Sequence, residues 1–315
     1  MPHLAEALLR AAGPLTFALP AWKLPAERAG SEARDTSGRT MRNLVIILGD
    51  QLDAGSAAFD GFDPGADAVW MAEVAAEADY VWSTKTRLVM FLSAMRHFRE
   101  DQRANGRTVL YRELDDPANR GSFAAELAAA VAEHKPERLV MVQPGAHRVR
   151  EEIAEAAGEA GAELEVRPDR HFLCTTGRFA EYAANRKQLR MEHFYRGMRR
   201  EHGVLMDDGD PAGGRWNFDA DNRGRFGRDG PGDLPPTPSF PPDETTREVI
   251  RLIDDRFSDR PGRLSEFNWP VTPEQARASL DHFIEHRLAS FGPYQDAMWT
   301  GRPLLHHSRL SAAMN

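Results

Sequence analysis

The sequence predicts an α/β protein in which a parallel sheet is flanked by helices. Between residues 43 and 169, short apolar segments of strand length alternate with longer segments of helical periodicity, which is typical of such a sheet. The chain has 315 residues, 41% of them hydrophobic, which is sufficient for a substantial core. No GxGxxG and no GxxxxGK[ST] segment is present, so neither a dinucleotide fingerprint nor a P-loop is predicted.

Five apolar segments are the predicted strands. They cover residues 43–48, 66–74, 108–114, 137–144 and 163–168.

Apolar spacing and capping residues predict the helices. One apolar stripe between the second and third strands consists of Leu88, Phe91, Leu92, Met95 and Phe98. The next helix carries Phe123, Leu127 and Val131, with Ser122 as its N-cap.

Helical patterning returns after a region rich in Pro and Gly at 203–243, which we interpret as a long linker or functional loop. It covers residues 245–257, and residues 272–275 form a capping box for a further helix that runs to about Ser290. His307 and Ser308 are expected to open a new helix at the end of the chain.

The single cysteine, Cys174, excludes a disulfide within the chain and cannot hold a metal cluster alone. The longest apolar runs, such as 44–48, are far too short for a membrane span. A cytoplasmic protein without a signal peptide or membrane partner is therefore predicted. Residues 1–40 are expected to be a weakly ordered extension or a misassigned start, because the first strong strand follows Met41 directly.

A ligand site is predicted where the first two strands end. Gly49, Asp50 and Gln51 follow the first strand, at the edge where open α/β sheets bind ligands. The second strand ends near Glu73 and Glu77, and carboxylates beside aromatic residues suit a planar heterocycle with polar edges. Asp50 could instead cap the next turn.

A basic segment with aromatic residues is the second candidate site. Seven Lys or Arg residues lie between residues 178 and 200, although the net charge of the chain is −8. A local positive patch on an acidic protein indicates an anionic partner, and the alternative is a solvated helix. The candidate contacts to the phosphate groups of such a partner are Arg186, Lys187, Arg196, Arg199 and Arg200.

Two further candidates are weaker. Asp219 and Asp296 could meet and hold a divalent cation, although helix capping explains them equally well. Hydroxyl groups at Ser308 and Ser311 lie at an expected helix start, where unpaired N–H groups favour a phosphate, and a serine N-cap is the structural alternative.

Several long motifs resemble one known family in the same order. They are NLVIILGDQL (43–52), SAMRHF (93–98), NRKQLRMEHFYRGMRR (185–200), GGRWNFDADNR (213–223), QDAM (295–298) and HSRLS (307–311). In these motifs the chain resembles the deoxyribodipyrimidine photolyase-related proteins, the bacterial cryptochromes and photolyases with an iron–sulfur cluster.

The resemblance implies specific cofactor sites. Glu77 matches a glutamate near the antenna chromophore, often a ribityllumazine, so the implied antenna residues are Gly49, Asp50, Gln51 and Glu77. The implied FAD contacts are His307, Ser308, Leu310, Ser311 and Asn315. Family members also carry a 4Fe-4S cluster, whose cysteines are absent from this chain.

The resemblance also implies the domain plan. After residues 1–40 it predicts a Rossmann-like antenna domain at 41–175, a helical and loop connection at 176–243, and the first helices of an all-α FAD-binding domain, truncated, at 244–315.

The implied activity is light-driven repair of pyrimidine dimers, in this branch the (6-4) photoproducts, by electron transfer from reduced FAD in a monomer bound to damaged DNA. The alternatives are a blue-light sensor of the same architecture, a non-catalytic α/β module that binds a small molecule, and a nonfunctional fragment.

Overall fold

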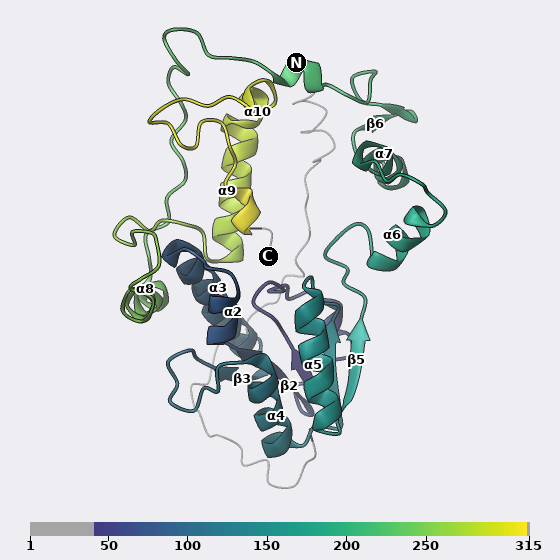
Figure 1. Cartoon of the computed structure of the whole chain (residues 1–315), viewed down its shortest axis with the longest axis vertical. Coiled ribbons are helices and arrows are strands. Elements are labelled where there is room, and N and C mark those ends of the chain that lie inside the picture. The colour runs from purple at the N-terminus through teal and green to yellow at the C-terminus, as the bar shows by residue number, and fades with distance from the viewer. Residues whose placement is uncertain (1–40, 314–315) are drawn as a thin grey trace, which may run out of the picture. The chain divides into compact units, whose positions relative to one another are not determined.

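Residues 41–313 are described by a computed structural model of the chain (Figure 1). The predicted extension at residues 1–40 and the predicted FAD contact Asn315 lie outside the described residues. The described residues form two compact units, and each is considered separately. The α/β unit comprises residues 41–175, 236–282 and 308–313, and the linker unit comprises residues 176–235 and 283–307.

A five-stranded parallel sheet is the centre of the α/β unit. Its strands are β1 (Asn43–Ile46), β2 (Asp67–Ala72), β3 (Thr108–Arg112), β4 (Arg138–Val142) and β5 (Glu163–Arg167). The strand order is β3-β2-β1-β4-β5, and every neighbouring pair is parallel. This order places the topological switch point between β1 and β4 and confirms the predicted Rossmann-like α/β fold.

Helices cover both faces of the sheet. They are η1 (Ala57–Phe59), α2 (Ala75–Tyr80), α3 (Lys85–Ala104), α4 (Phe123–His134) and α5 (His147–Glu159). Side chains of α4 and α5, including Leu127 and Ile153, pack on one face, while η1 and the second half of α3 pack on the other. The predicted N-cap of α4 is confirmed, because the Ser122 hydroxyl accepts a hydrogen bond from the Ala125 N–H at 3.3 Å.

Helix α8 (Glu244–Arg256) packs on α3 within the α/β unit, although more than sixty residues separate it from β5. Val249 and Ile253 of α8 are fully buried against α3 and the segment that follows β3. Helix α8 therefore belongs to the core of the α/β unit.

The capping box before α9 (Pro273–His286) is confirmed with one change. The Thr272 hydroxyl accepts from the Gln275 N–H at 3.4 Å, whereas the Gln275 side chain accepts from the Val271 N–H at 2.8 Å. The prediction that this helix runs to Ser290 is wrong, because the backbone of Arg287 leaves the helical region with φ −127°. A separate helix, α10 (Leu288–Tyr294), begins after it.

The linker unit contains short elements. They are α6 (Thr176–Ala183), α7 (Met191–His202), the two-residue strands β6 (Met206–Asp207) and β7 (Asp210–Pro211), η2 (Asp219–Asn222) and α10.

The new helix expected from His307 is only the 3-10 helix η3 (Leu310–Ala313). Among the described helices, none is both long and apolar enough to cross a membrane.

Candidate functional site

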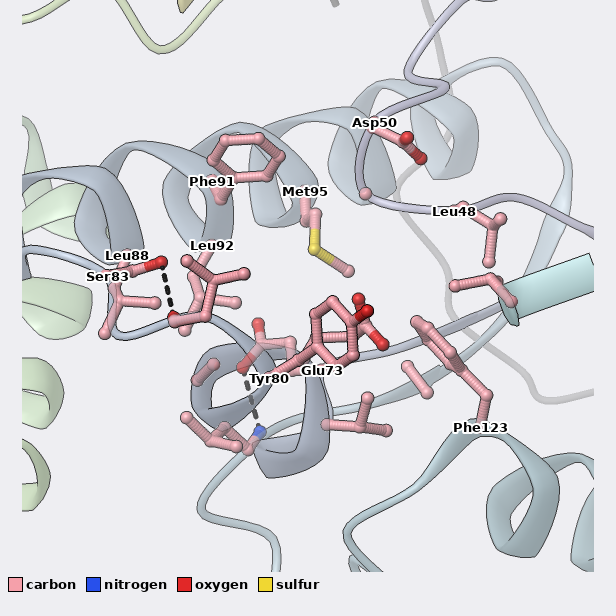
Figure 2. Close-up of a pocket in the computed structure, with 18 of the residues that line it drawn as sticks. Leu48, Asp50, Glu73, Tyr80, Ser83, Leu88, Phe91, Leu92, Met95 and Phe123 are labelled. Atoms are coloured by element: carbon pink, nitrogen blue, oxygen red, sulfur yellow. Dashed lines mark hydrogen bonds between the residues drawn. The ribbon is translucent and has the colours of Figure 1, made fainter. Parts of the chain in front are cut away.

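A cavity of about 300 Å³ lies in the α/β unit, at the carboxyl ends of β1 and β2 (Figure 2). Its wall on one side is formed by Phe91, Leu92 and Met95, which are successive inward positions of α3. Phe123, the first residue of α4, contributes a second aromatic ring. This position at the edge of the sheet is the one predicted, and the volume is at the lower end of the range for small-molecule sites.

Helix α8 completes the cavity with Ile253 and Phe257. Polar contacts fix this helix in place. Lys85 of α3 pairs with Asp254 at 2.6 Å, and the Arg256 guanidinium donates to the Leu114 carbonyl at 2.9 Å. Because α8 supplies one wall, the segment 41–175 alone does not form the complete cavity.

An arginine, a glutamate and a tyrosine lie together in the cavity lining. Both guanidinium NH₂ groups of Arg148, at the start of α5, donate to the two carboxylate oxygens of Glu77 at 2.6 Å each. The Arg148 guanidinium also lies 3.7 Å from the ring centroid of Tyr80, a cation–π distance. The hydrogen bond with Glu77 raises the pKa of Arg148, against the smaller effect of burial. The bidentate pair holds the Arg148 guanidinium over one face of the Tyr80 ring, and this ring is 65% exposed.

Asp50 also lines the cavity, after the end of β1 (Figure 2). Desolvation raises the pKa of its carboxyl group, and the negative charges of Glu77 and Asp169 raise it further, while a backbone hydrogen bond opposes both. Asp50 is therefore a carboxyl group at the cavity whose charged form is disfavoured by its surroundings.

Replacing Asp50 with Asn is expected to raise the melting temperature at pH 7. The pKa of the Asp50 carboxyl group is higher in the folded chain than its ordinary value, so the folded state binds this proton more tightly than the unfolded state does. The stability that this proton contributes is fully present below the ordinary pKa and is lost as pH rises through the folded pKa. The neutral variant avoids this loss. Melting curves of both proteins from pH 3 to pH 8 test this, and we expect the difference to vanish at the acidic end. A variant that is equally stable at pH 7 would show that the carboxylate carries no penalty.

The other two residues predicted beside β1 have different positions. Gly49 lines the cavity, and a Cβ atom there would lie 2.8 Å from the Met95 sulfur, so a larger residue would displace the Met95 side chain. Gln51 is not part of the cavity lining. Its side-chain amide donates to the Gln143 carbonyl at 3.1 Å, and its buried Oε1 atom has no hydrogen-bond partner within residues 41–313.

Glu73 belongs to the cavity lining but is fully engaged by the protein. It is 1% exposed, and its carboxylate accepts two hydrogen bonds from Arg96, at 2.8 and 3.0 Å. The Tyr111 hydroxyl and the Leu114 N–H donate to it at 2.7 and 2.8 Å. Burial alone would lower the pKa of Arg96, but the hydrogen bonds and charge of Glu73 outweigh it and raise this pKa. Glu73 therefore serves to hold β2, α3 and β3 together.

The predicted basic segment of the linker unit gathers around one indole ring. The guanidinium groups of Arg196, Arg199 and Arg200 lie 5.5, 5.1 and 4.5 Å from the ring centroid of Trp216. These three contacts hold the Trp216 ring against α7.

The five predicted phosphate contacts differ in their availability. Arg199 is buried and donates to the carbonyl groups of Val204 and Leu205, so it closes the C-terminal turn of α7. Arg196 pairs with Glu192, and Arg186 folds back onto the ring of Tyr182 at 4.1 Å. Lys187 and Arg200 are exposed.

The predicted FAD and cation residues show local contacts. The Ser308 hydroxyl accepts from the Leu310 N–H at 3.2 Å, a local contact just before η3. The His307 ring meets Phe291 edge-on at 5.5 Å, and Leu310 and Ser311 lie in η3.

Asp219 and Asp296 are both exposed residues of the linker unit. The Asp219 N–H donates to the Asn217 side chain at 2.8 Å, within the turn that begins η2. Among residues 41–313, no three His, Cys, Asp or Glu side chains are grouped as a metal site.

Sequence reasoning missed Arg148 and the α8 residues of the cavity. Arg148 follows the end of β4, so the rule that locates ligand residues at strand ends could have found it. Ile253 and Phe257 carry no comparable signal, because only the folded chain brings α8 to α3.

Comparison with known proteins identifies the family. Residues 45–269 match the family described as deoxyribodipyrimidine photo-lyase-related protein, and the chain belongs to this family. It is 44% identical over 277 residues to a (6-4) photolyase of Agrobacterium fabrum (strain C58 / ATCC 33970). That match covers 87% of this chain and 54% of the relative, so the chain spans about half the length of that protein.

Proposed function

We propose that the chain acts in a light-driven DNA photolyase that repairs (6-4) photoproducts. The relative named as a (6-4) photolyase supports this reaction. FAD, when bound in its reduced form, would supply the electron for repair. The chain's own part is to bind an antenna chromophore in the α/β unit and to contact damaged DNA through basic residues.

The cavity is the observation that carries the proposal. Its apolar wall of Phe91, Leu92 and Met95 suits a flat ring system, and the Tyr80 ring held by Arg148 offers a surface on which such a ring can stack. Asp50 and the Glu77–Arg148 pair offer polar groups to hydroxyl groups of a ribityl chain. These features fit a ribityllumazine as the antenna.

The two other family cofactors fit the described residues differently. Residues 307–311 would contribute a serine hydroxyl and backbone groups to an FAD phosphate. A 4Fe-4S cluster does not fit this chain, because Cys174 cannot supply four thiolates.

Titration of the 315-residue chain with a ribityllumazine, followed by lumazine fluorescence, tests the cavity assignment. We expect saturable one-to-one binding with a dissociation constant in the micromolar range or below. This corresponds to a favourable binding free energy of about 8 kcal/mol or more. Absorption spectra after incubation with FAD test flavin binding separately. Lumazine binding without flavin would favour the non-catalytic α/β module, and no binding of either would contradict the photolyase proposal.

Repair of a (6-4) lesion under blue light distinguishes the photolyase from the light sensor. A photolyase returns the two pyrimidines, whereas a sensor of the same architecture leaves the lesion unchanged while it binds flavin. The assay requires the chain loaded with FAD and a duplex with a single lesion.

A further inference from the structure

The loop at residues 223–230, with the sequence RGRFGRDG, is a basic surface of the linker unit that we call the basic loop. It carries Arg223, Arg225 and Arg228, and all three are exposed. None of the three has an ion pair or hydrogen bond to a side chain of residues 41–313. The only acid in the loop is Asp229.

Three other arginines of the same unit are paired with acids. Arg178 pairs with Glu201, Arg196 with Glu192, and Arg215 with Asp221. Like the exposed Lys187 and Arg200, the three arginines of the basic loop form no ion pair with residues 41–313, and they lie within six residues of one another. On a chain of net charge −8, such a concentration of cations indicates an anionic partner.

Glycine residues hold the basic loop close to an aromatic cluster. The Gly224 N–H donates to the Pro293 carbonyl at 2.8 Å, and a Cβ atom at Gly224 would lie 2.7 Å from that oxygen. A Cβ atom at Gly230, where φ is +75°, would lie 2.9 Å from the Trp299 ring. Only glycine permits both close approaches.

Phe226 anchors the loop between these glycines. Its ring stacks on Tyr294, with centroids 4.7 Å apart and planes inclined by 18°, and it meets Trp299 edge-on at 6.3 Å. The loop is thus fixed at both ends and in the middle. A fixed backbone avoids the entropic cost of ordering the loop on binding, so that only the arginine side chains have to be ordered.

We infer that the basic loop binds the phosphodiester backbone of DNA through Arg225 and Arg228, with Arg223 as a third contact. Guanidinium groups match phosphate oxygens in a bidentate geometry. A lipid surface fits less well, because Phe226, the one large apolar residue of the loop, is turned into the aromatic cluster. The inference deepens the proposed function, in which DNA is the partner, but its test requires neither flavin nor light.

The test is binding of an undamaged 20-base-pair DNA duplex by the full chain in the dark, measured by fluorescence anisotropy at several salt concentrations. For the variant Arg225→Ala/Arg228→Ala we expect an affinity about tenfold lower at low salt, and a slope of log affinity against log salt reduced by about 2. The matched control is Arg150→Ala/Arg263→Ala, which removes the same charge from exposed residues of the α/β unit. We expect the control to bind DNA as the unchanged chain does.

Gly224→Ala tests the anchoring. We expect this variant to bind DNA with an affinity between those of the unchanged chain and the double variant, because its Cβ atom displaces the loop from Pro293. Equal DNA affinity of the two double variants would overturn the inference, and so would a full chain without affinity for DNA. Lumazine binding tests the cavity independently, so failure of the loop and failure of the antenna assignment are distinguishable.

Discussion

Replacing Glu73 with Gln is expected to lower the free energy of unfolding by about 3–5 kcal/mol. The two side chains of the ion pair are nearly inaccessible, with Glu73 1% and Arg96 4% exposed. Glutamine keeps the shape of the side chain but removes the charge, so Arg96 is left as a buried cation without its main counterion. Urea denaturation of the variant and the unchanged chain measures the difference.

Glu244→Gln is the matched control, because Glu244 pairs with Arg247 at the surface, where both side chains are more than half exposed. We expect this change to cost about 0–1 kcal/mol. If Glu73→Gln cost no more than the control, the buried pair would not be what holds β2 to α3. The double variant Glu73→Leu/Arg96→Met is expected to remain destabilised, because Tyr111 and the Leu114 N–H would lose their acceptor.

The sheet and its covering helices were predictable because their signals are local. The Val-rich and Leu-rich segments of the five strands and the stripe at Leu88, Leu92 and Met95 specify element type from neighbouring residues alone. The parallel arrangement followed from the alternation of strands and helices. The place of the ligand cavity followed from the arrangement, because open parallel sheets bind at the carboxyl ends of their strands.

The partners of individual side chains could not be predicted in the same way. Glu73 and Glu77 looked alike in the sequence as two carboxylates after β2, yet Glu73 is buried with Arg96, whereas Glu77 pairs with Arg148 in the cavity lining. The choice depends on contacts between residues 23 and 71 positions apart. Spacing within one segment carries no information about such long-range pairs.

The basic segment shows a second limit of sequence reasoning. Charge counting treated Arg199 and Arg200 as equivalent phosphate contacts, but the helical position of Arg199 directs it to the carbonyl groups that end α7. The basic loop was missed because its three arginines are separated by glycines, which broke the pattern of a helix face. The significance of those glycines depends on Pro293 and Trp299, far away in the sequence.

Replacing Leu92 with Trp is expected to lower the affinity for a ribityllumazine by about 100-fold, or about 2.7 kcal/mol. Leu92 is half-buried and lines the cavity from α3, so an indole at this position occupies volume that the ligand needs (Figure 2). Overpacking is expected to cost about 1–3 kcal/mol of stability, which a core of this size tolerates, and circular dichroism checks that the variant is folded. Leu189→Trp is the matched control, because Leu189 lies in the linker unit and is 51% exposed. Equal lumazine affinity of the two variants would show that the chromophore binds elsewhere, and loss in Leu92→Trp alone would place it in the cavity that α3 and α8 enclose.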